Sequence, residues 1–196
     1  AAAAIPRPTP NCATTPPGGW SAVPSGYIAG SNSLDLYYKI AQAGDIGASV
    51  TVTFSGSQTM ALGLDVYYSP RFKVLYIDAT AQADNTTATT HDFPAVTTTK
   101  PEAILGLFQS IGSTSANGAQ PPDNAFLTQN TSNTAPRVTS LWRRGYSAGS
   151  TGTTTVTHSN TTTARLVTVA IAERDYPGDP TGLAAAAISD DQIDLS

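Results

Sequence analysis

Short runs in which apolar and polar residues alternate, separated by turn residues, recur along this chain of 196 residues. A period of two is typical of a strand that buries one face of its sheet. The run LDLYYKI at 34–40 is the clearest example. It predicts an outer face of Asp35, Tyr37 and Lys39 and an inner face of Leu34, Leu36, Tyr38 and Ile40. β-Branched and aromatic residues in this pattern favour a half-buried antiparallel sheet.

Two further runs, VTVTF at 50–54 and MALGLDVYYS at 60–69, repeat the alternation after a turn at 43–45. Their large apolar residues are predicted to join the inner face: Val50, Val52, Phe54, Leu62, Leu64, Val66 and Tyr68. Tyr67 then falls on the outer face beside Asp65, as Tyr37 does in its own strand.

The rest of the chain predicts more strands, at 73–83, 93–99, 102–112, 137–149, 152–159 and 163–173. The run at 102–112 is predicted to be fully buried, and the run at 163–173, apolar on both faces, to be central. Polar residues at 85–90 and 113–135 indicate loops, the second one unusually long. No long amphipathic helix pattern occurs between these strands. We therefore predict an all-β fold, a two-sheet antiparallel β-sandwich of the jelly-roll kind.

This sandwich domain is expected to span residues 16–173. Residues 1–15 (AAAAIPRPTPNCATT) are a Pro-rich lead, which we interpret as the remainder of a truncated or processed N-terminus. Residues 174–196 contain Pro177, Gly178 and Pro180 and are rich in aspartate, so we expect an irregular acidic C-terminal arm. Such an arm either hangs free or packs on a neighbouring subunit.

The composition excludes several classes of function. Only 12% of residues are charged, where about 25% is usual. Of the 14 acidic residues, five aspartates follow Arg174, which leaves nine acidic against ten basic residues in the body. The body therefore lacks the basic surface that nucleic-acid binding needs. No apolar run approaches the roughly 18 residues of a membrane span. Two histidines, two glutamates and the single Cys12 leave little material for a metal site, a cofactor or acid–base catalysis.

One short motif raises the question of catalysis. Gly145–Gly149 (GYSAG) matches the nucleophile elbow of α/β-hydrolases, with Ser147 in the nucleophile position. The elbow requires a helix after the serine, but the residues that follow are strand formers. His158 is the only histidine downstream. A glycine-rich hairpin loop explains the motif better, and a serine hydrolase using Ser147 is kept as a minor alternative.

Aromatic side chains on the predicted outer faces are the remaining candidates for a binding site. Tyr37 and Tyr67 share the outward register of their strands, and Trp142 is followed by Arg143. Exposed aromatic residues on a sandwich face can stack on sugars or contact a protein partner. We take Tyr37, Tyr67, Trp142 and Arg143 as candidates for partner or glycan binding.

Several segments in order carry a resemblance to a known family: PPGGWSAV (16–23), LDLYYKIAQAGD (34–45), SVTVTFSG (49–56), YIDATAQA (76–83), FPAVTTTKPEAILGLF (93–108), GYSAGSTGTTTVT (145–157) and RLVTVAIAE (165–173). Together they resemble a β-sandwich domain of virion surface proteins in tailed bacteriophages, notably minor tail and head-decoration proteins of actinobacterial phages. The likeness rests on the tryptophan after a Pro-Gly turn, the Y-x-K-x-A-x-x-G-D strand and turn, and the D-A-x-A strand end. It covers about residues 16–173.

The resemblance implies a non-enzymatic structural protein on the virion surface, either a minor tail protein or a capsid decoration protein. It transfers no catalytic residue and no cofactor. The implied partners are other virion proteins and further copies of the chain in a homo-oligomer, for which a trimer is one option. A host-surface glycan is a further candidate partner. The alternative from a different class is a secreted bacterial carbohydrate-binding module, which would need its aromatic residues exposed and coplanar.

Overall fold

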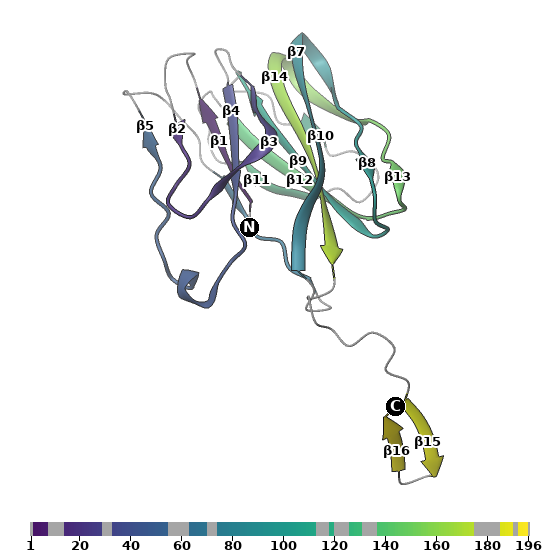
Figure 1. Cartoon of the computed structure of the whole chain (residues 1–196). Coiled ribbons are helices and arrows are strands. Elements are labelled where there is room, and N and C mark those ends of the chain that lie inside the picture. Colours follow the sequence, from purple (N-terminus) through teal and green to yellow (C-terminus); the bar gives the residue numbers. More distant parts are fainter. Residues whose placement is uncertain are drawn as a thin grey trace.

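The computed structural model describes residues 2–7, 14–28, 33–54, 63–69, 74–112, 118–119, 126–130, 137–174, 185–189 and 192–195. It confirms the all-β prediction, because nearly all of the regular structure in these residues is antiparallel strand. Two larger sheets pack face to face as a β-sandwich (Figure 1). The one helical element among the described residues is a single 3-10 turn, η1 (Ala43–Asp45).

The first sheet has four strands in the order β3 (Ser21–Ile28), β4 (Ser33–Tyr38), β1 (Ala2–Arg7) and β6 (Gly63–Asp65). β1 comes from the segment that the sequence indicates as a lead, and it pairs along its whole length with β4. β2 (Thr14–Thr15) and β5 (Thr53–Phe54) form a small separate pair.

The second sheet is built around two long strands, β7 (Val74–Phe93) and β14 (Thr154–Arg174). From β14 the sheet continues through β9 (Ala103–Ile111) and β12 (Arg137–Tyr146) to β11 (Phe126–Asn130). β10 (Gly118–Ala119) pairs with β14 beside His158. β8 (Thr97–Thr98) and β13 (Gly149–Ser150) form a further short pair.

The inner core lies between the two sheets. Leu34 and Leu36 of β4 belong to the same buried cluster as Phe108 of β9. The cluster consists of Val23, Leu34, Leu36, Ile104, Phe108, Val138, Val167, Val169 and Ile171. Burial of this apolar surface is the main driving force for association of the sheets. The predicted inward positions of Leu34 and Leu36 are confirmed.

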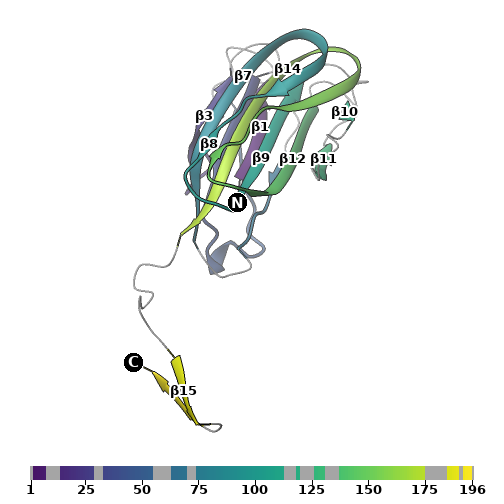
Figure 2. The same cartoon turned by 90° about the vertical axis from the view of Figure 1, so that its right-hand side faces the viewer.

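A second cluster covers the opposite face of the second sheet. Leu105 and Leu107 of β9 pack there with Phe93, at the end of β7, and Val156, near the start of β14. Successive residues of a strand point to opposite faces, so Leu107 and Phe108 lie in different layers. The paired ends of β7 and β14 therefore double back over the outside of their own sheet. Figure 2 shows the two strands curving together at one end of the sandwich.

This second layer explains why every residue of β9 is buried, as its apolar run predicts. The central position predicted for 163–173 is also confirmed, because β14 lies between β7 and β9. Other predictions in this sheet are wrong. Residues 85–90 form part of β7 and not a loop, and the runs predicted as separate strands at 152–159 and 163–173 fall, from Thr154 onward, on one continuous β14. β12 pairs with β9 and β11.

Two segments that are predicted to be irregular contain strands. Within 113–135 these are β10 and β11, and the remainder of that stretch lies outside the described residues. In the C-terminal arm, β15 (Ala185–Ser189) pairs with β16 (Gln192–Leu195) as a hairpin (Figure 1). In the part of the chain that the structure describes, no helix has the length and apolar character needed to cross a membrane.

Candidate functional site

Tyr37, the first aromatic candidate, lies in the interior. Its exposed fraction is 5%, and Asp35 on the same strand is buried as well. β4 is flanked by β3 and β1, and all of Ser33–Tyr37 is buried, so both faces of the strand are covered. The predicted exposure of Tyr37 is therefore wrong, because both faces of β4 are buried along Ser33–Tyr37.

Tyr67 is also directed inward. Burial alternates from 63 to 69 as predicted, but with the opposite phase: Leu64, Val66 and Tyr68 are exposed, while Tyr67 packs against the inner core. Burial, with a smaller effect of Asp65, raises the pKa of the Tyr67 hydroxyl. Tyr67 reaches across to Gly106 of the second sheet, where a Cβ would lie 3.0 Å from the Tyr67 hydroxyl oxygen and 2.8 Å from a ring carbon of Phe108. Only glycine fits at Gly106.

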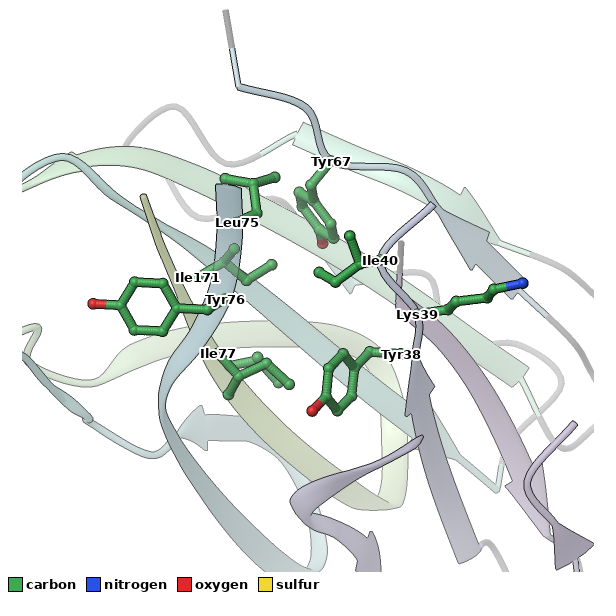
Figure 3. Close-up of a pocket in the computed structure, with 9 residues that line it drawn as sticks. Tyr38, Lys39, Ile40, Tyr67, Leu75, Tyr76, Ile77 and Ile171 are labelled. Carbon is green, nitrogen blue, oxygen red and sulfur yellow. The ribbon is translucent and has the colours of Figure 1, made fainter. Parts of the chain in front are cut away.

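A small cavity lies beside Tyr67 at the boundary between the two sheets. Side chains from both sheets face one another across it (Figure 3): Tyr38, Ile40, Tyr67, Leu75, Ile77 and Ile171. The side chain of Lys39 points away from it. Its volume is about 30 Å³, which is enough for a water molecule and too small for a sugar ring. This cavity is a packing feature of the sandwich.

Trp142 and Arg143 are both partly buried on β12. Because they are successive residues of a strand, their side chains leave the sheet on opposite faces. The Arg143 guanidinium carbon lies 5.1 Å from the ring centroid of Tyr146, a cation–π contact. The four predicted residues are thus not brought together on one exposed surface, and they do not form the coplanar platform that a glycan site would need.

The large exposed hydrophobic side chains of the described residues all come from residues 40–68: Ile40, Ile46, Val50, Leu64, Val66 and Tyr68. Ile46 is the most exposed of them, and Val66 has an exposed fraction of 68%. Three of these residues, Val50, Leu64 and Val66, line one groove, and we call these three the apolar face. Large apolar residues that gather on a surface in this way mark an interaction site more often than isolated ones do.

A groove of about 390 Å³ runs through the apolar face. Val50, Leu64 and Val66 line it together with Trp20 and the turn at Pro17–Gly18. Sites for small ligands and for anchoring side chains have volumes of this order. Sequence analysis missed Trp20 as a site residue, although the turn PPGGW that positions it is visible in the chain.

The groove also contains one ion pair. The Lys39 Nζ lies 2.5 Å from Asp45 Oδ1, and the backbone N–H of Gln42 donates to Asp45 Oδ2 at 2.8 Å. The hydrogen bond from Lys39, followed by that from Gln42, holds the pKa of Asp45 below its usual range. These bonds hold the 3-10 turn to the end of β4 at the position where Lys39 and Asp45 line the groove.

The hydrolase alternative gains no support from the geometry. Ser147 lies between β12 and β13, and no helix follows it within the described residues. Neither ring nitrogen of His158 has a hydrogen-bond partner, so no serine–histidine pair is formed. The described residues also contain no group of three or more histidine, cysteine or acidic side chains placed to hold a metal ion. Asp179, Asp190 and Asp191 of the acidic arm lie outside them.

Comparison with known proteins adds no relative. No protein-family model matches the chain, and searches of curated proteins and of solved structures give no match.

Proposed function

We propose that this protein is a non-enzymatic structural component of a bacteriophage virion surface, as a minor tail or capsid decoration protein. It acts through contacts with other virion proteins and with further copies of itself, and is located on the particle. The observation that carries the proposal is the apolar face: the exposed hydrophobic side chains Val50, Leu64 and Val66 line one groove together with Trp20. The order of sequence segments that resembles phage virion domains gives the class of particle.

The apolar face has the character of a docking surface for protein. Aliphatic side chains dominate it, and the two charged groups in the groove, Lys39 and Asp45, form an ion pair with each other. A partner that covers Val50, Leu64 and Val66 removes their apolar surface from water, which stabilises the complex by about 25 cal/mol for each Å² buried. Such a surface favours a permanent neighbour, because in an isolated chain it would promote aggregation.

Replacement of Val66 by aspartate should prevent this docking. An uncompensated carboxylate in a dry interface costs several kcal/mol, and each 1.4 kcal/mol lowers affinity about tenfold. We expect the copy number of the chain per particle to fall at least about tenfold when Val66→Asp is supplied to particles that lack the wild-type protein. Quantitative mass spectrometry of purified particles measures this number.

Thr89→Asp is the matched control, because Thr89 is exposed, as Val66 is, but lies on β7, outside the apolar face. Circular dichroism should show that both variants fold. Equal incorporation of Val66→Asp and Thr89→Asp would contradict the assignment of the apolar face as the docking surface.

One observation favours the alternative of a carbohydrate-binding module. The groove combines Trp20 with the charged side chains of Lys39 and Asp45, and aromatic and polar groups together can hold a sugar. On this alternative the ligand platform would be Trp20, and not Tyr37, Tyr67, Trp142 and Arg143. Saccharide binding that is lost in Trp20→Ala, with particle incorporation unaffected by Val66→Asp, would favour it over the proposed function.

A further inference from the structure

The only two histidines of the chain lie against each other in the interior. His91 is on β7 and His158 is on β14, with exposed fractions of 2% and 3%. Their ring centroids are 5.3 Å apart and the rings are tilted by 57°. Neither ring nitrogen of His158 has a hydrogen-bond partner, and the ring nitrogens of His91 have no well-aligned partner beyond the nearby backbone of Ala88 and Thr162. Buried polar atoms are rarely left in this state, and each such case calls for an explanation.

The pair lies in the part of β7 and β14 that doubles back over the second sheet. His91 is in register with Val156, and His158 with Gly118 of β10. Their neighbours Phe93 and Val156 belong to the outer cluster. The pairing of β7 with β14 shifts register just beyond, between Thr157 and Thr162, and such irregularities bend a strand pair. The histidine pair thus lies where the bent ends of β7 and β14 pack on the outer face of the second sheet.

The surroundings provide little to compensate a positive charge. Asp92 is exposed, and it already accepts a hydrogen bond from Thr155 Oγ1 at 2.5 Å. β10, which pairs with β14 at His158, contributes only Gly118–Ala119, without an ionisable side chain. Among the described residues no third histidine, cysteine or acidic side chain is placed with the two histidines to hold a metal ion, so a metal site does not explain the pair.

Burial lowers the pKa of both imidazoles. For His158, burial and then the neighbouring His91 lower the pKa to about 4. For His91, burial lowers the pKa, although the backbone of Ala88 and Thr162 and the charge of Asp92 partly oppose this shift. Because the folded pKa lies below the unfolded value of about 6.5, the stabilisation is complete above pH 6.5. It is lost as the pH falls towards 4.

We propose that His91 and His158 form an acid-sensitive latch that holds the doubled-back ends of β7 and β14 on the outer face of the second sheet. When both rings are neutral, they pack as apolar groups and the outer layer is closed. Protonation of one ring places an uncompensated charge in this layer, and release of the strand ends into water relieves it. The two main sheets stay packed through the separate inner core. This inference does not depend on the proposed virion function.

Hydrogen–deuterium exchange at pH 7.5 and pH 5.0, corrected for the intrinsic rates, tests the latch. For His158 alone, the change in pKa from about 4 to about 6.5 on opening raises the opening equilibrium roughly 10- to 30-fold at pH 5.0. We expect the protection of 88–93 and 154–160 to fall by this factor, while 34–38 and 104–108 keep theirs. An unchanged pattern, or a uniform loss across all four segments, would overturn the proposal.

The double variant His91→Leu and His158→Leu is the matched control. Its side chains remain apolar and cannot be protonated, so the difference between the two pH values should disappear in 88–93 and 154–160. If this variant fails to fold, NMR titration of the histidine ring protons in the wild-type chain gives an independent result. An apparent pKa below 5 for His158 is expected, and a value of 6 or higher would overturn the proposal.

Discussion

Replacing Phe108 by alanine is expected to lower the free energy of unfolding by about 3–5 kcal/mol. Phe108 is completely buried at the centre of the inner core, where it packs between β4 of the first sheet and β14 of the second. Alanine removes the transfer free energy of the ring and leaves a cavity that well-packed neighbours cannot fill. The loss is a large part of the stability of a typical domain.

Urea denaturation followed by tryptophan fluorescence measures this change. Ile46→Ala is the control, because Ile46 is the most exposed large hydrophobic side chain described and its truncation should cost less than about 0.5 kcal/mol. A cost below about 1 kcal/mol for Phe108→Ala would mean that the two sheets do not pack through this residue.

Leu107→Ala is expected to cost about 2–5 kcal/mol, a loss comparable with that for its neighbour Phe108. Leu107 is fully buried on the opposite face of β9, in the cluster with Phe93 and Val156. In a sandwich of only two layers this side chain would face water, and its truncation would cost about 0.5 kcal/mol or less. The measured value therefore reports whether the ends of β7 and β14 form an outer layer.

The same denaturation experiment tests whether this outer layer exists, and a variant of Thr168 serves as the comparison. Thr168 of β14 is in register with Leu107 and is also buried, but its hydroxyl has no hydrogen-bond partner. Thr168→Val should be neutral or stabilising if the outer layer is dry. Near-neutral behaviour of Leu107→Ala, together with destabilisation by Thr168→Val, would contradict the outer layer.

The class of fold could be predicted because local sequence patterns determine it. The alternation in 34–40 and the continuous apolar run in 103–108 reflect how many faces each strand buries, and both predictions hold for Leu34, Leu36 and Phe108. When both faces of a strand carry large residues, the alternating pattern does not reveal which face is buried. In 63–69 Tyr67 and Val66 are equally plausible core residues, and contact with Gly106 on a distant strand decides for Tyr67.

The candidate site could not be predicted from sequence patterns for a related reason. Residues 20, 50, 64 and 66 come from separate parts of the chain, and only the tertiary fold brings them to one groove. The full length of β7 and β14 was also not predicted, because the polar residues at 85–90 and 159–163 resemble turns. These residues are tolerated in strands here because the paired ends bend away and leave many of their side chains exposed.

The central claim is that this chain is a structural protein of a phage particle. Immunogold electron microscopy of purified particles, with an antibody raised against the chain, tests it most directly. Regular labelling over the head is expected for a capsid decoration protein, and labelling confined to the tail is expected for a minor tail protein. Either pattern is the result that we predict, whereas particles without label, from a host in which the chain is produced, would contradict the claim.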